Sequence, residues 1–247
     1  MDFIDIHIHL QDYKTNFAID IVKKAQTLNY KKLLCAGISE KDWGKVAKWT
    51  DLYPDMIVPA FGVHPWQIAD ISDNWDTLLC SYIEKYPQAI IGETGIDGLK
   101  ENPQQQKQIF VQHIEIAEQY NRPLIIHAVK AVSYFEDLWD KLPEKFMFHS
   151  FNGKVEHLKN ILSKNGYVSF SASILKNKDF EKIVQNVPVK KILVESDGPY
   201  QPFEKGTIST PFFIPELLKY IAKARKCDYE ELAYQIYQNS LEFINVR

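Results

Sequence analysis

The sequence is poor in cysteine: its 247 residues include only Cys35, Cys80 and Cys227, which are widely spaced. None belongs to a Cys-x-x-Cys pair, so the sequence predicts neither a disulfide framework nor a zinc site built from thiolates. Unpaired cysteines are typical of proteins in a reducing compartment, and we therefore expect a cytoplasmic protein.

Long apolar runs are also missing, and none approaches the length that crosses a membrane. The first residues lack the basic segment followed by an apolar segment that is typical of a secretory signal. No internal repeat, low-complexity tract or linker divides the chain. These absences predict a soluble protein in which residues 1–247 form one domain, with no membrane partner and no obligate protein partner.

A surplus of positive charge is absent as well, because the formal net charge is −3 at pH 7. The chain therefore lacks the overall basic field expected for tight, processive binding to nucleic acid. Between Lys154 and Lys191, however, eight lysines outnumber three acidic residues. This excess is consistent either with a local basic patch or with the solvated faces of outer helices.

Two histidines lie one residue apart near the start of the chain, in the run Phe3-Ile-Asp-Ile-His-Ile-His-Leu10. The run is apolar and β-branched, which is typical of a buried strand. Since side chains alternate between the faces of a strand, we expect His7 and His9 on one side and Ile6 and Ile8 on the other. Paired neutral imidazoles suit a divalent transition metal, although an isolated His-x-His more often combines one core and one exposed histidine.

Later apolar runs also end in residues of the types that bind metals. These residues are His64, Glu93, His127, His149, Glu195 and Asp197. A short continuous apolar run is typical of a strand covered on both faces, as in a parallel sheet. Polar residues confined to the carboxyl ends of such strands are typical of a (β/α)8 barrel, whose active site is built there. The remaining histidines, His113 and His157, fall in predicted helices, and we expect them at the surface.

The order of the predicted elements supports a closed barrel. Strands are predicted over residues 2–8, 32–37, 57–62, 89–93, 123–127, 146–149, 166–171 and 191–196. Amphipathic stretches predict helices over Phe17–Leu28, Lys41–Trp49, Trp75–Tyr86, Gln104–Tyr120, Ser133–Lys141, Val155–Asn165, Phe180–Asn186, Pro215–Lys226 and Tyr229–Ile244. This alternation predicts an α/β protein with one TIM-type (β/α)8 barrel of typical size.

Six blocks carry a resemblance to a known family. They are His7-Ile-His9, Gly62-Val-His64-Pro65, Ile91-Gly-Glu93-Thr-Gly95-Ile-Asp97, Ile126-His127, His149-Ser-Phe-Asn-Gly153 and Glu195-Ser-Asp197-Gly-Pro-Tyr200. In this order, over nearly the whole chain, they resemble the TatD family of metal-dependent hydrolases, which includes the TatD-type deoxyribonucleases. The resemblance implies a barrel of the metallo-dependent hydrolase kind and a centre of two divalent ions: zinc, magnesium or manganese. The implied reaction is phosphoester hydrolysis by an exonuclease-like deoxyribonuclease, acting on single-stranded or frayed DNA ends or on a small phosphoester.

The resemblance also implies roles for individual residues. The implied ligands are His7, His9 and Asp197 for the first metal, His127 and His149 for the second, and Glu93 as a bridge between both. A bridging carboxylate offsets the repulsion between two cations, and the hydroxide held between them is the nucleophile. The catalytic residues are then Glu93, Asp197, which could also receive the proton, and His64 beside the substrate phosphate.

Several of these residues keep a structural alternative. His64 could instead be an imidazole that packs within a loop. Lys130 and Tyr200 are candidate substrate contacts, but exposed Lys and Tyr are more often solvated surface groups. Glu195 shares a strand face with Asp197, so it either orients a ligand histidine from behind or forms a buried ion pair.

The sequence departs from the family pattern around the substrate and keeps the ligands. Gln11 stands where family members usually have Asp, and Trp66 where they usually have His. After His127 the frequent Ser-Arg pair is replaced by Ala128-Val129, with Lys130 next. The metal centre is therefore better supported than nuclease activity.

Two other functions remain open at this point. The first is an amidohydrolase-like enzyme that hydrolyses a small ester, lactone or C–N substrate. Many amidohydrolases bridge their metals with a carboxylated lysine where this chain has Glu93, which disfavours the cyclic-amide enzymes among them. The second is a barrel that binds a metal or a partner without turnover, and the complete set of ligand-type residues argues against it.

Overall fold

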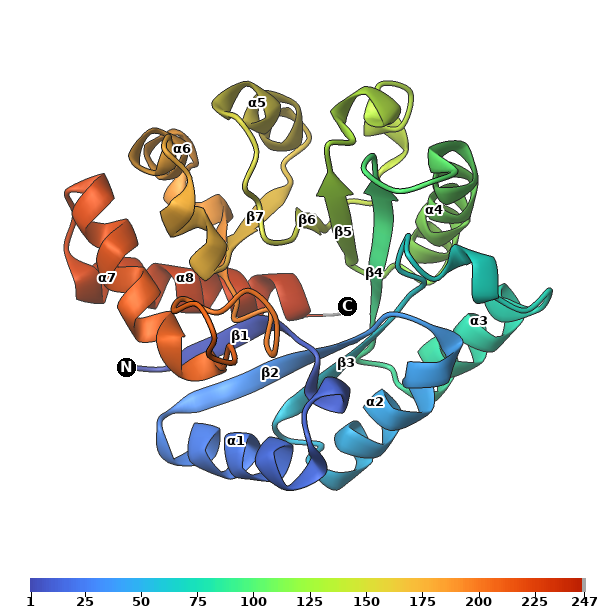
Figure 1. The fold of residues 1–247 in the computed structure, drawn as a ribbon, viewed down its shortest axis with the longest axis horizontal. Coiled ribbons are helices and arrows are strands. Elements are labelled where there is room, and N and C mark those ends of the chain that lie inside the picture. Colours follow the sequence, from blue (N-terminus) through green and yellow to red (C-terminus); the bar gives the residue numbers. More distant parts are fainter. Residues whose placement is uncertain (246–247) are drawn as a thin grey trace.

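The computed structural model describes residues 1–245, and within them eight parallel strands follow one another around a barrel in chain order (Figure 1). The strands are β1 (Phe3–Ile8), β2 (Tyr30–Gly37), β3 (Ile57–Phe61), β4 (Ile90–Asp97), β5 (Leu124–Val129), β6 (Phe146–Phe148), β7 (Tyr167–Phe170) and β8 (Ile192–Val194). Nearly all of their residues are buried, as the continuous apolar runs predict. The structure confirms the predicted α/β barrel.

Helices surround the strands on the outside (Figure 1). They are α1 (Thr15–Thr27), α2 (Glu40–Leu52), α3 (Trp75–Lys85), α4 (Pro103–Gln119), α5 (Val155–Ser163), α6 (Phe180–Asn186), α7 (Ile214–Arg225) and α8 (Tyr229–Ile244). None of the helices in the described part of the chain is long and apolar enough to span a membrane.

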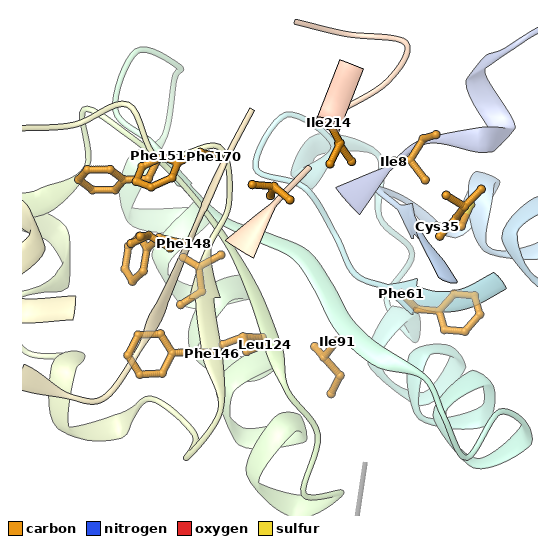
Figure 2. Packing of buried hydrophobic residues seen from close by; sticks show 14 of the residues in the cluster. Ile8, Cys35, Phe61, Ile91, Leu124, Phe146, Phe148, Phe151, Phe170 and Ile214 are labelled. Carbon is orange, nitrogen blue, oxygen red and sulfur yellow. The ribbon is translucent and has the colours of Figure 1, made fainter. Parts of the chain in front are cut away.

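Two hydrophobic clusters fill the two sides of the strands. The larger joins strand residues to the helices and includes Phe61, Ile91 and Phe146 (Figure 2). The smaller takes at least one residue from every strand and is joined by Phe243 of α8, so it fills the barrel interior. Because side chains block the interior, polar groups collect at the strand ends.

The first and last strands meet through hydrogen bonds around the polar strand ends. The backbone N–H of Asp197 donates to the carbonyl of His7 over 3.0 Å, and that of His9 donates to the carbonyl of Gly198 over 2.8 Å. The buried Asp5 carboxylate also accepts from the Ser196 backbone N–H at 2.9 Å and from the Ser196 hydroxyl at 2.5 Å. The two ends of the sheet are therefore held together where His7, His9 and Asp197 lie.

The helix predicted over Ser133–Lys141 is wrong. The segment forms two separate 3-10 turns, η3 (Val132–Phe135) and η4 (Trp139–Lys141). Pro143 follows closely, and it disfavours helical backbone at the residue before it, so little room is left for a helix to continue. The turns bring Phe135 and Trp139 against Phe148, at ring-centroid distances of 5.3 and 5.7 Å.

The surface position expected for His113 is also wrong, whereas His157 is partly exposed in α5. His113 is fully buried in α4 and stacks on Trp75, with ring centroids 4.7 Å apart. Its Nδ1–H donates to the Ile109 carbonyl, and its Nε2 accepts from the Val63 backbone N–H at 3.0 Å. His113 thus ties α4 to the loop that carries His64.

We expect His113 to make stability depend on pH. Burial lowers its pKa to about 4, so between about pH 6.5 and pH 4 the unfolded chain binds a proton that the folded chain does not. This group alone should remove on the order of 3 kcal/mol of unfolding free energy as the pH falls through that window. Urea denaturation of the wild type and His113→Gln at pH 7 and pH 4.5 checks this, and the difference between the two proteins should shrink at the lower pH. A difference that stays constant with pH would contradict a neutral His113.

Candidate metal centre

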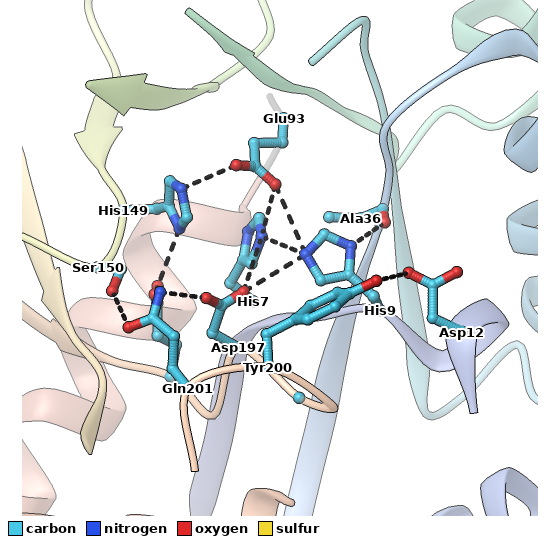
Figure 3. A network of polar contacts seen from close by, with 12 residues as sticks. His7, His9, Asp12, Ala36, Glu93, His149, Ser150, Asp197, Tyr200 and Gln201 are labelled. Carbon is cyan, nitrogen blue, oxygen red and sulfur yellow. Dashed lines mark hydrogen bonds and ion pairs between the residues drawn. The ribbon is translucent and has the colours of Figure 1, made fainter. Parts of the chain in front are cut away.

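Seven of the predicted site residues converge at the carboxyl ends of the strands, and all are buried. They are His7 in β1, His9 just after it, His64 after β3, Glu93 in β4, His127 in β5, His149 after β6 and Asp197 after β8. Figure 3 shows His7, His9, Glu93, His149 and Asp197 among them. The structure thus gathers at one place side chains that are as much as 190 positions apart in the sequence. Their roles stay predictions, but their common location is an observation.

The two carboxylate oxygens of Glu93 face two different groups of imidazoles. Oε2 lies 3.2 Å from Nε2 of His7 and 3.5 Å from Nε2 of His9. Oε1 lies 2.9 Å from Nδ1 of His127 and 2.9 Å from Nε2 of His149. One carboxylate therefore joins two adjacent sets of donors, which is the arrangement expected of a bridging ligand.

The first set is completed by Asp197. Its Oδ1 lies 3.4 Å from Nε2 of His9 and 3.9 Å from Nε2 of His7. The two Nε2 atoms are themselves 3.2 Å apart. Three donor atoms from different side chains thus surround one point, as they would around a divalent cation.

Hydrogen bonds behind the rings decide which nitrogen carries the proton. Nδ1 of His9 lies 2.8 Å from the Ala36 carbonyl, which only accepts, so in the neutral ring the proton is on Nδ1 and Nε2 has the lone pair that faces the cluster. Nδ1 of His149 lies 3.4 Å from Oε1 of Glu195 and is protonated for the same reason. Glu195 therefore lies where the sequence places it, behind a candidate ligand, and the Ser169 hydroxyl donates to its other oxygen.

His64 has the opposite tautomer. Its Nδ1 accepts from the Trp66 backbone N–H at 3.1 Å, so the proton of the neutral ring is on Nε2. That nitrogen lies 3.2 Å from Oε1 of Glu93 and donates to it. Burial lowers the pKa of His64, which keeps the ring neutral. His64 therefore presents a hydrogen-bond donor to the cluster, where His9 and His149 present lone pairs.

The electrostatics of the cluster favour added positive charge. Burial disfavours a charged His9, yet Asp197 and Glu93 outweigh burial and raise its pKa to about 9. Burial is likewise outweighed at His149, where Glu93 and Glu195 hold the pKa well above its usual value. Burial alone would raise the pKa of Glu93, but the charge of His149 and hydrogen bonds from His127 and His149 outweigh it and keep this pKa well below its usual range. A divalent cation would supply this positive charge in place of the protons.

The donor set therefore fits two divalent ions. Donor atoms of imidazoles and carboxylates lie close together. Within each candidate group of three residues, the three donor atoms lie within 4.8 Å of one another. Among the buried polar atoms without a hydrogen-bond partner are Nδ1 of His7 and Nε2 of His127. The buried clusters of His, Glu and Asp are consistent with a binuclear metal site.

Two glycines allow Glu93 to lie beside His127. Gly92 and Gly95 have φ angles of +123° and +146°, which side-chain-bearing residues rarely adopt. A Cβ at Gly92 would lie 2.6 Å from the Ile125 carbonyl oxygen, and one at Gly95 would lie 2.0 Å from that of His127. The close approach of β4 to β5 at the site thus depends on glycine on both sides of Glu93.

Three residues near the cluster escaped sequence reasoning. Gln201 donates to Oδ2 of Asp197 and accepts from Ser150 at 2.7 Å (Figure 3). Asp97 accepts from the indole N–H of Trp66 at 2.7 Å and lies 3.7 Å from Nε2 of His127. Asp5 holds β8 to β1, and burial raises its pKa to about 7. Asp5 lies inside an apolar run and Asp97 follows one, and a carboxylate in such a position could have been predicted to be buried near the site. The sequence around Gln201 gives no such signal.

The predicted substrate contacts lie at the edge of the cluster. Tyr200 is half-exposed, packs its ring edge-on against His9 and donates to Asp12 at 3.0 Å. Lys130 is exposed just after β5. Trp66, which departs from the family pattern, is 57% exposed beside His64, with ring centroids 5.0 Å apart. Aromatic and cationic groups therefore border the site on several sides.

Comparison with known proteins identifies relatives over the whole described barrel. A family model described as TatD related DNase matches residues 4–245. Deoxyribonuclease TATDN3 of Homo sapiens is 26% identical, over 97% of this chain and 93% of that protein. The 3'-5' ssDNA/RNA exonuclease TatD of Erwinia tasmaniensis is 23% identical, over 98% and 99% respectively. The crystal structure of YJJV, a TatD homolog from Escherichia coli, is similar with a TM-score of 0.91 at 20% identity, over 99% and 98% of the two chains.

We expect divalent ions to stabilise the folded protein. A ligand that binds only the native state at about 100 times its dissociation constant adds about 2.7 kcal/mol, which corresponds to a rise of roughly 5–10 °C in melting temperature. Thermal melts with Zn²⁺, Mn²⁺, Mg²⁺ or Co²⁺ and with a chelator, together with elemental analysis, check this. Asp197→Asn should reduce both the bound metal and the shift, while the exposed control Asp20→Asn should change neither. Absence of bound metal together with no shift for any ion would contradict the metal centre.

Proposed function

Because the chain belongs to the TatD-related DNase family, a family of metal-dependent hydrolases, we propose that it hydrolyses phosphodiester bonds at the ends of single-stranded DNA. The names of two relatives support this substrate: one is a deoxyribonuclease and the other a 3'-5' exonuclease for single-stranded DNA and RNA. Both are about a quarter identical to this chain over nearly its whole length. We propose a cytoplasmic location, since Cys35, Cys80 and Cys227 are all free.

The position of Glu93 is the observation that carries the proposal. Its two oxygens face separate groups of donors, so one side chain can hold two cations at once. In the proposed assignment His7, His9 and Asp197 hold one cation, and His127 and His149 hold the other. Imidazole-rich sets favour zinc by affinity, and the shared carboxylates also suit manganese or magnesium. When bound, the ions would polarise a phosphoryl oxygen and supply hydroxide at neutral pH.

The remaining groups have roles in handling the substrate and the proton. His64 directs Nε2–H into the site and would donate to a phosphoryl oxygen, whose negative charge it would stabilise. Asp197 is a carboxylate at neutral pH, since His9 outweighs burial and lowers its pKa, so it can accept the proton of the attacking water. The P–O bond to the 3'-oxygen of the shortened strand breaks as the new P–O bond forms, the nucleotide leaves as its 5'-monophosphate, and the 3'-oxygen takes up the proton that Asp197 accepted.

We expect Glu93→Gln to abolish turnover of every substrate. The amide keeps the shape of the side chain but loses the charge that both donor sets share. Removal of a group that only orients a metal ligand lowers metal affinity or activity about 10- to 100-fold. Removal of a shared ligand should therefore lower kcat by more than about 100-fold. Rates with a 3'-labelled single-stranded oligonucleotide check this, and Glu115→Gln, exposed on α4, is the matched control. A Glu93→Gln protein that retains wild-type kcat with full metal content would exclude the two-metal mechanism.

The same assay separates the nuclease from its alternative. Oligonucleotides, simple phosphodiesters, carboxylic esters and lactones are tested side by side with the metal-loaded wild type. Cleavage of oligonucleotides that disappears in Glu93→Gln supports the proposal. Cleavage of a lactone or carboxylic ester, with no phosphodiester cut under any metal, would leave the metal centre in place and exclude the nuclease.

A further inference from the structure

A pocket of about 520 Å³ opens beside the candidate metal centre. His127 and His149 lie in its wall, so a part of the substrate that fills the pocket would adjoin the part that reacts at the metal centre. Its other walls come from η3 and η4 after β5, from the N-terminal end of α5 and from the loop that follows β7. A smaller hollow of about 240 Å³ lies at the opposite end of the barrel, near Pro123 and Lys145, and is remote from these histidines.

Part of the pocket wall is aromatic. Trp139 is half-buried, stacks on Phe148 with the ring planes at 27°, and lies 5.6 Å from the ring of Phe135. This wall exists because residues 132–141 form two turns and not the helix that the sequence predicts. The turns hold Trp139 at the pocket, where the indole can stack on a planar group.

The rim of the pocket is positively charged. Lys130, Lys154 and Lys178 are exposed along it, and Asp179 is the only acidic residue among the lining residues. Hydroxyl and amide groups separate the rim from the ligands, among them Ser150, whose hydroxyl is hydrogen-bonded to Gln201. The pocket therefore combines an apolar wall with a surrounding charge that attracts anions.

We propose that this pocket binds the unpaired base of the nucleotide that adjoins the scissile phosphate, with Trp139 as its stacking partner. The inference rests on the proposed nuclease function and specifies its substrate. A planar aromatic group attached to a polyanion matches an aromatic wall inside a cationic rim, and stacking on aromatic side chains tolerates every base. An uncharged ester would gain nothing from the three lysines.

Product binding tests this inference without requiring turnover. Isothermal titration of the metal-loaded protein compares deoxyadenosine 5'-monophosphate with deoxyribose 5-phosphate, which lacks the base. We expect the nucleotide to bind at least about tenfold more tightly, the effect of one stacked base. Trp139→Leu, which keeps an apolar side chain but removes the ring, should erase this preference and leave the affinity for deoxyribose 5-phosphate unchanged. Trp139→Phe should keep most of it.

Control variants separate the pocket from general effects. Tyr234→Ala removes an aromatic ring that is 63% exposed on α8 and should bind both ligands like the wild type. Circular dichroism and melting temperature check that Trp139→Leu is folded. If it is not, the preference of Trp139→Phe for the nucleotide over deoxyribose 5-phosphate, compared with that of the wild type, decides whether the ring contributes to binding. Equal affinity of the two ligands for the wild type, or an unchanged preference in a folded Trp139→Leu, would overturn the inference.

The two proposals can fail separately. If oligonucleotides are cleaved but the base adds no affinity, the nuclease proposal stands and the pocket assignment is wrong. If no phosphodiester is cleaved, the proposed function fails, and titration of the metal-loaded wild type with the two ligands still reports whether the pocket binds a base.

Discussion

The organisation of the site depends on one buried carboxylate. Burying an ionised group costs several kcal/mol unless opposite charges or donors surround it, and Glu93 is almost fully buried. Imidazole nitrogens lie on both of its oxygens, and hydrogen bonds behind the rings of His9 and His149 point their lone pairs inward. Such a cluster is favourable only with added positive charge, which is the reason we expect metal binding to stabilise the folded barrel.

Much of this arrangement could be predicted from the sequence because a parallel barrel places the carboxyl ends of its strands on one side. The apolar runs before Glu93, His127 and Asp197 located the strands, and the ligand-type residues located the site. The alternation rule was less reliable within β1. Ile6 lies in the interior cluster and Ile8 in the outer one, because the pairing of β1 with β2 shifts register between Asp5 and Ile8. A local shift of this kind has no signature in the pattern of side chains.

The residues that sequence reasoning misplaced are held by contacts between distant segments. His113 lies on the buried stripe of α4 with Phe110 and Ala117, a periodicity that was a usable signal. The Val63 backbone N–H and the Trp75 ring, both outside that helix, satisfy its polar nitrogen and cover its ring. The turn around Trp139 stacks its ring on Phe148, which comes from the next strand. Gln201 reaches Asp197 only through the loop after β8. None of these partners is recognisable from nearby sequence.

The contact between Asp5 and Ser196 also determines when the site can form during synthesis of the chain. These residues are 191 positions apart, and the group of His7, His9 and Asp197 cannot be complete before β8 has emerged and docked on β1. Glu93, His127 and His149 are available much earlier, since they come from three successive strands in the middle of the chain. A nascent chain would therefore acquire its two sets of ligands in sequence, and the set joining its two ends would be the last step of a slow, long-range closure.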